Sequence, residues 1–189
     1  MKLRFVGMAF ATLLLASSAA RADLVTNGGF ETGDFTGWTV TNDNLSFVYS
    51  SDPLYGPHGG TYEALLGAYG SDGTLSQTIS DVAGQTLRLV YWIASDGNAP
   101  NDFSATWNGN VIAGSALSNA GKTGYVEYIF NVVATGSDVL GFNERNDNGF
   151  LSLDDVSLNV VPEPGTLVLL GAGLAGFGAF RRRKAMKAA

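Results

Sequence analysis

Short runs of alternating apolar and polar residues, separated by clusters of Gly, Asn, Asp and Ser, restrict the fold of this 189-residue chain more than any other feature. Leu87, Leu89, Tyr91 and Ile93 occupy every second position of one such run, and residues 126–132 repeat the pattern. Successive side chains of a strand point to opposite faces, so these runs predict half-buried antiparallel strands. Long stretches with the 3.6-residue period of a helix are absent from the middle of the sequence.

The turn signals predict how the strands are joined. Asn108-Gly109 lies between two apolar runs and predicts a two-residue hairpin, because both turn positions require a positive φ. Residues 143–149 read as a polar loop. We expect an all-β, antiparallel β-sandwich (jelly roll) of about 8–10 strands, with helix only at the two ends of the chain. Further strands are expected over residues 25–30, 38–49, 62–68, 74–80, 139–144 and 150–159.

The first 22 residues have the pattern of a secretory signal peptide. Lys2 and Arg4 precede an apolar stretch, and Ala20-Arg21-Ala22 is a small-x-small cleavage signal. The apolar stretch is short for an uncleaved membrane helix. We therefore predict export, a sandwich domain over 23–160 and a separate tail over 161–189.

The charge of the middle region excludes two classes of partner. Residues 23–161 contain three basic and sixteen acidic side chains, a net charge of −13. Such a surface repels nucleic acid and anionic membranes and favours divalent cations, which prefer carboxylate and carbonyl oxygens. A solvated acidic coat is the alternative. The sequence has no cysteine, so the domain must be held by its apolar core, by a bound ion, or by both.

Catalytic signals are weak. His58 is the only histidine, and no nucleophile-elbow or zinc-type spacing accompanies it. Asp154 and Asp155 are adjacent on an expected strand, so they would point to opposite faces unless a bulge reorients them. We predict no catalytic residues.

The tail from Thr166 to Phe180 is apolar or Gly at almost every position and is followed by Arg181-Arg182-Arg183-Lys184. As a helix it would be roughly 22 Å long, short of the bilayer core of roughly 30 Å. We expect a marginal transmembrane helix over 165–180 that holds the chain transiently in the inner membrane, with the basic residues on the cytoplasmic side.

Two stretches of the middle region resemble a known group of domains. Asn27-Gly28-Gly29-Phe30-Glu31 and the 151–158 segment resemble the first and last strands of jelly-roll modules in the carbohydrate-binding, galactose-binding-like group. The resemblance implies that these strands meet around a structural Ca²⁺ held by Glu31, Asp155 or Asp154, and backbone carbonyls from Asn27 to Gly29. The alternative is that the two aspartates form a bulge that faces water.

The same resemblance implies sugar binding. Sugar-binding sandwiches use exposed rings that stack on pyranose faces, with polar groups beside them. The candidate rings are Tyr55, Tyr62, Trp92 and Trp107, whereas Trp38 is expected in the core. Interior packing is the alternative for each of them.

The tail closely resembles the PEP-CTERM sorting signal, which some family descriptions call the ice-binding protein C-terminal domain. The resemblance lies in Pro162, Glu163 and Pro164, the apolar segment, and Arg181, Arg182 and Arg183. It implies a Gram-negative bacterium in which an exosortase processes the tail and the domain reaches the cell surface or an exopolysaccharide matrix. An ordinary anchor that is never cut is the alternative.

These features together predict an exported, non-catalytic surface or matrix protein that binds a carbohydrate such as exopolysaccharide. A structural matrix or adhesion protein without a small ligand is the second hypothesis. An enzyme acting on exopolysaccharide is the third.

Overall fold

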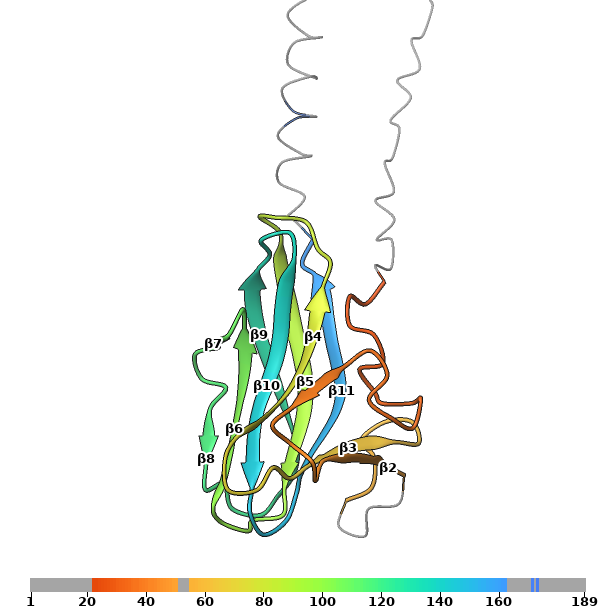
Figure 1. The fold of residues 1–189 in the computed structure, drawn as a ribbon. Helices are drawn as coiled ribbons and strands as arrows, with labels where there is room; N and C mark the ends of the chain where they lie inside the picture. The colour runs from red at the N-terminus through yellow and green to blue at the C-terminus, as the bar shows by residue number, and fades with distance from the viewer. Residues whose placement is uncertain (1–21, 51–54, 163–170, 172, 174–189) are drawn as a thin grey trace, which may run out of the picture.

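The computed structural model describes residues 22–50 and 55–162, together with Gly171 and Gly173. Two antiparallel sheets pack face to face as a β-sandwich (Figure 1), which confirms the predicted all-β class. Within 22–50 and 55–162 no residue is helical. The expected signal peptide and almost all of the expected transmembrane helix lie outside the described residues. Among the described residues, no helix has the length and apolar character needed to span a bilayer.

The described residues form eleven strands, one more than the upper limit expected. The strands of sheet A follow the order β1 (Thr39–Thr41), β4 (Gly73–Ile79), β10 (Asp138–Asn146), β6 (Asn101–Trp107) and β7 (Asn110–Val111), with β8 (Leu117–Ser118) also pairing β6. The strands of sheet B follow the order β2 (Phe47–Tyr49), β3 (Glu63–Leu66), β11 (Leu151–Val160), β5 (Thr86–Ser95) and β9 (Thr123–Val133).

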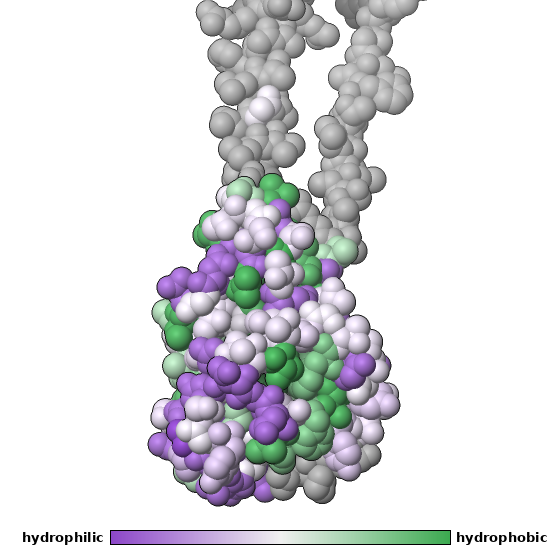
Figure 2. Space-filling model, in the orientation of Figure 1, coloured by the Kyte–Doolittle hydropathy of each residue, from purple (hydrophilic) through white to green (hydrophobic). Residues whose placement is uncertain are grey.

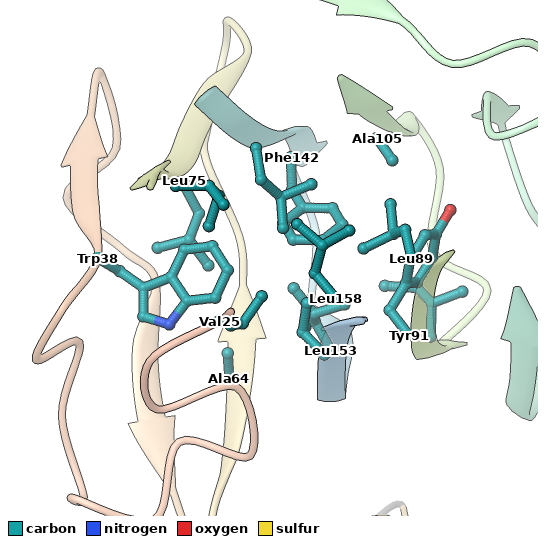
Figure 3. Packing of buried hydrophobic residues seen from close by; sticks show 14 of the residues in the cluster. Val25, Trp38, Ala64, Leu75, Leu89, Tyr91, Ala105, Phe142, Leu153 and Leu158 are labelled. Atoms are coloured by element: carbon teal, nitrogen blue, oxygen red, sulfur yellow. The ribbon is translucent and has the colours of Figure 1, made fainter. Parts of the chain in front are cut away.

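The inward positions of both sheets form one apolar core. Leu75 and Phe142 of sheet A face Leu89, Tyr91 and Leu158 of sheet B (Figure 3), and each of these side chains is at most 2% exposed. Burial of one such side chain stabilises the fold by about 1.5–3 kcal/mol. The alternation predicted for β5 is confirmed, because its inward residues are buried while Arg88, Val90 and Trp92 face outward.

The core also includes the expected Trp38, which is 8% exposed and contacts the rings of Phe30 and Phe142. Its indole nitrogen donates to the carbonyl of Asn27 at 3.1 Å. The N-terminal segment also bonds to both sheets, through Leu24 to Leu158 of β11 and through Thr26 to Gln77 of β4.

One strand prediction was wrong and another was confirmed only in part, because Asn and Asp side chains form local hydrogen bonds with the backbone in both segments. Residues 25–30 are not a strand: Asn27 and Phe30 have positive φ, and the Asn27 amide donates to Thr32, Asp34 and Thr36. Residues 38–49 are interrupted after Thr41, where Asn42 has a positive φ and Asp43 accepts the N–H groups of Leu45 and Ser46. Local bonds of this kind compete with sheet pairing.

The other differences are smaller. The polar loop expected over 143–149 is shorter, since β10 continues to Asn146, and Arg145 pairs with Asp147 at the end of the strand. The two-residue β8 was missed because it is too short to show a period. The Asn108-Gly109 hairpin is confirmed, with φ of 52° and 75°.

Candidate functional site

The loop between β2 and β3 lies against the outer face of sheet B and brings several predicted residues together. The described part of this loop begins at Tyr55, whose hydroxyl donates to the carbonyl of Ser95 at 2.8 Å. Gly56 and Gly60 have φ of 66° and 60°, a region that favours glycine and allows the chain to turn there. We refer to residues 55–62 as the cover loop.

The lone histidine lies at the centre of the cover loop. The ring of His58 stacks on Trp92 of β5 with 3.9 Å between centroids and 17° between planes. The rings of Tyr55 and Tyr125 lie within contact distance of each other, and Tyr125 also contacts His58. His58 Nδ1 lies 2.6 Å from Asp155 Oδ2. The result is an aromatic cluster with a carboxylate at its edge.

A β-bulge explains why two adjacent aspartates both reach the cover loop. The register between β11 and β5 shifts between Asp154 and Ser157, and Asp155 has a φ of 48°. Asp154 accepts the N–H of Gly59 at 3.0 Å, while Asp155 contacts His58. The bulge therefore reorients the pair, the exception to strand alternation that the sequence left open.

Two glutamates complete the site from other segments. Glu31 Oε1 accepts the N–H groups of Thr61 and Tyr62 at 2.8 and 3.1 Å. Glu63 of β3 is fully buried and accepts the hydroxyl of Tyr125 at 2.6 Å. Glu31 and the Asp154–Asp155 pair thus hold the cover loop from two different segments. A hydrogen bond to a charged group is stronger than one between neutral groups.

Burial changes the proton affinity of the site. It raises the pKa of Asp154 to about 6, even though two backbone N–H groups, from Gly59 and Asp155, favour the charged form. Burial and the neighbouring Glu63 raise the pKa of Tyr125, so its hydroxyl remains a donor. The site offers rings, carboxylates and one imidazole, which suits recognition of hydroxyl groups beside an apolar face.

The residues expected to hold Ca²⁺ are partly brought together. The position that a Cβ of Gly29 would occupy lies 3.5 Å from Asp155 Oδ1 and 3.7 Å from Glu31 Cγ, so both carboxyl groups flank this glycine. The carbonyl of Asn27 accepts from Phe30 and Trp38, and that of Gly28 accepts from Val156. Both oxygens of Asp154 also accept backbone N–H groups.

Glu31 Oε2, Asp155 Oδ1 and the carbonyl of Gly29 accept no hydrogen bond from the described protein. Oxygen ligands of this kind fit Ca²⁺ chemically. Within the described part of the chain, no three His, Asp or Glu side chains form a metal-binding group by themselves. Carbonyl or water oxygens would have to complete a shell around the two carboxylates.

The remaining candidate rings lie apart from the stack. Tyr62 is half-buried at the end of the cover loop, beside Gly33. Trp107 is on β6 in the other sheet, packs against the core and donates its Nε1–H to the carbonyl of Val133 at 3.1 Å. The structure therefore gathers Tyr55 and Trp92, and places Trp107 elsewhere.

Three members of the site were missed. His58 was considered only as a catalytic residue, and nothing near it in sequence indicates that it stacks on Trp92. The positions of Glu63 and Tyr125 in the sequence give only a weak indication that they belong to the site. Glu63 lies within the strand expected over 62–68, and Tyr125 lies one position before the alternating run over 126–132.

Comparison with known proteins identifies the tail. Residues 160–184 match the model of the PEP-CTERM protein-sorting motif. The tail is a PEP-CTERM sorting motif. It begins at the last residue of β11, and it contains the predicted Pro162, Glu163, Pro164 and the three arginines. Among the residues of this motif, those from 163 onward lie outside the described structure, apart from Gly171 and Gly173.

Solved structures resemble the domain that precedes the PEP-CTERM motif. A family 61 carbohydrate-binding module, solved in complex with β-1,4-galactotriose, is 22% identical, with a TM-score of 0.57 over 75% of this chain and 100% of the module. The xylan-binding CBM22-1 domain of Xyn10C from Paenibacillus barcinonensis is 16% identical, with a TM-score of 0.54 over 78% of this chain and 100% of the domain. At these identities the likeness shows a shared fold.

A third neighbour is the K1 cleaved adhesin domain of Lys-gingipain from Porphyromonas gingivalis W83. It is 10% identical, with a TM-score of 0.53 over 68% of this chain and 96% of the domain. Among curated proteins, none matches the sequence. Carbohydrate-binding modules are therefore among the structural neighbours of the chain, as the resemblance of its first and last segments implied.

Proposed function

We propose that this chain is an exported glycan-binding protein of the bacterial cell surface or exopolysaccharide matrix. The observation that carries the proposal is the half-exposed stack of His58 on Trp92, with Tyr55 and the Asp155 carboxylate beside it. Rings supply the apolar surface that a pyranose face requires, and the carboxylate and imidazole accept or donate hydrogen bonds to hydroxyl groups. The fold shared with carbohydrate-binding modules supports the same function.

A glycan array with the purified full-length chain tests this function. We expect binding to one class of neutral polysaccharide, lost on Trp92→Ala and retained on Trp107→Ala. The second variant is a matched control, because it removes the same ring from the other sheet. An array without any signal would instead favour a structural or adhesion role, which the likeness to an adhesin domain also supports.

The sorting part of the proposal rests on the PEP-CTERM motif. A signal peptide and this motif together imply transfer across the inner membrane, transient anchoring by the 165–180 segment, and processing by an exosortase. Replacing Pro162, Glu163 and Pro164 by alanine in the host should leave full-length chains in the membrane fraction. If the unaltered chain is also found only at full length in that fraction, it is an anchored protein that is not cut.

We also propose that Ca²⁺ binds between Glu31 and Asp155 at the carbonyl of Gly29. The ion would bridge the N-terminal segment to β11 and neutralise two of the carboxylates that crowd around the cover loop. Its role here is structural, since an ion that binds only the folded state stabilises that state.

A further inference from the structure

A pocket of 280 Å³ lies on the outer face of sheet A, on the opposite side of the sandwich from the cover loop. It lies over β6 and β10, where Asn143 pairs in register with Ser104. Its polar lining includes Asp72, Asp102, Ser104, Ser118 and Asn143. We call this hollow the acidic pocket. Hydrophilic residues gather on this face over the lower part of β10 (Figure 2).

The carboxylates of the acidic pocket differ from almost all others in the described chain. Among the described carboxylates, only Asp72, Asp102 and Glu127 neither accept a hydrogen bond from the protein nor form an ion pair. Two of these three line the pocket. The hydroxyl groups of Ser104 and Ser118 and the amide nitrogen of Asn143 have no protein partner either. The pocket therefore presents a set of unused acceptors and donors.

Charge indicates what kind of ligand these groups accept. Arg145 is opposite Asp102 in the register of β6 and β10, but its guanidinium donates two bonds to Asp147. No described cation forms an ion pair with Asp72 or Asp102 within 4 Å, and both carboxylates interact with the Arg145 guanidinium only at longer range, where they raise its pKa. A pocket with two unpaired carboxylates, in a domain with a net charge of −13, rejects uronic acids and sulfated sugars and attracts a cationic ligand.

The volume and the apolar lining of the acidic pocket further restrict the kind of ligand that it can bind. A volume of 280 Å³ is at the small end of ligand pockets, which hold about 300–1,000 Å³, and suits one ring of a chain better than a longer segment. Val111 and Leu117 supply apolar surface at the wall of the pocket. A bare metal ion would not need this surface.

We propose that the acidic pocket binds a hexosamine unit with a free amine, as in a de-N-acetylated amino-sugar polymer. Asp72 and Asp102 bind the ammonium group, Ser104, Ser118 and Asn143 bind hydroxyl groups, and Val111 and Leu117 contact the C–H face of the ring. This site is separate from the cover loop and extends the proposed glycan binding to the opposite face of the sandwich. Two sites on opposite faces would allow one molecule to bridge two polysaccharide chains.

The test compares glucosamine tetramer with its fully N-acetylated counterpart by titration calorimetry. The full-length chain is used in a detergent that carries no sugar headgroup. We expect the tetramer with free amines to bind at least about tenfold more tightly, and Asp102→Asn and Asp72→Asn each to weaken its binding by about tenfold, the effect of losing one charge-assisted hydrogen bond. Both asparagine variants keep the size of the side chain.

Glu127→Gln is the matched control, because Glu127 is also unpaired but lies on β9 in the other sheet. It should leave binding unchanged. Equal losses in Glu127→Gln and Asp102→Asn would show diffuse attraction to the acidic surface and would overturn the site. Unchanged binding in Asp102→Asn, or equal affinity for both tetramers, would overturn it as well. Trp92→Ala should bind the free-amine tetramer normally, so failure here and failure of the cover-loop function are distinguishable.

Discussion

The two outer faces of the sandwich use the same residue types in opposite ways. On sheet B, Glu31, Asp154 and Asp155 accept bonds from the cover loop and hold it against the strands. On sheet A, Asp72 and Asp102 border a hollow and accept no bond from the described protein. A carboxylate with backbone partners organises the chain, whereas one without partners retains its capacity for a ligand. An acidic composition alone says nothing about this division.

The largest effect is expected at Glu144, a buried carboxyl of β10 that also lines the acidic pocket. Burial raises its pKa to about 8, the Ala68 N–H opposes this shift by favouring the charged form, and the neighbouring Asp43 and Asp72 raise the pKa further. Below pH 4.5 the group is protonated in both the folded and the unfolded state. Between pH 4.5 and about 8 the unfolded chain ionises first, so the free energy of unfolding falls as pH rises.

Glu144→Gln should remove this pH dependence and keep an acceptor for the Ala68 N–H. We expect the variant to exceed the wild-type chain in stability by on the order of 3–5 kcal/mol at pH 9 and to match it near pH 4, at about 1.4 kcal/mol per pKa unit. Urea unfolding at the two pH values measures the difference. A constant difference at both values would contradict the raised pKa.

A similar comparison can be made between glycines. A Cβ on Gly28 would collide with the backbone carbonyl of Val156, where the N-terminal segment meets β11. Gly28→Ala should therefore reduce the free energy of unfolding by about 3 kcal/mol and loosen the side of the molecule that carries the cover loop. Gly121→Ala is the control, because nothing lies within 4 Å of its Cβ position. Equal melting temperatures of the two variants would contradict the close packing of Gly28 against the Val156 carbonyl.

Removal of Ca²⁺ tests the carboxylates of the cover-loop face. If the ion is present at one hundred times its Kd, a chelator should lower the free energy of unfolding by about 2.7 kcal/mol. Glu31→Gln retains an acceptor for the Thr61 and Tyr62 N–H groups but should abolish the response to Ca²⁺. A melting temperature that is the same with Ca²⁺ and with chelator would exclude the site.

The smallest effect is expected at the acidic pocket. Asp72→Asn and Asp102→Asn should each change the free energy of unfolding by no more than about 0.5 kcal/mol, since neither carboxylate accepts a hydrogen bond or forms an ion pair within the described protein. Chemical denaturation of the full-length variants gives the measurement. A loss of unfolding free energy comparable to that of Gly28→Ala would mean that Asp72 and Asp102 stabilise the fold, as the carboxylates on the cover-loop face do.

Much of the architecture could be predicted, and the failures have local causes. The alternation of Leu87, Leu89, Tyr91 and Ile93 identified β5, and Asn108-Gly109 identified the hairpin between β6 and β7. The prediction of a strand over 25–30 was wrong because hydrogen bonds from the Asn27 side chain to Thr32 and Asp34 hold that segment in a loop. Sheet pairing is a sum of many contacts, and a single side chain with three local bonds can outweigh it in a short segment.

The candidate site was predicted in part. Trp92, Tyr55, Glu31 and the aspartate pair were singled out as separate ring and metal candidates, and the structure places them around one loop. His58 was not connected with them, because it is 97 residues from Asp155 and lies in a loop without periodicity. Trp107 matched the same criteria as Trp92 yet belongs to the other sheet.

The sequence by itself determined the all-β class and the sorting motif of the tail, because alternation and the Pro-Glu-Pro segment are read from neighbouring residues. Only the tertiary structure decided which carboxylates have partners. The bulge at Asp154 turns two adjacent acids toward one loop, and the pairing of β6 with β10 leaves Asp102 beside an open pocket. Contacts between residues far apart in the chain depend on strand register and loop path, which no local pattern encodes.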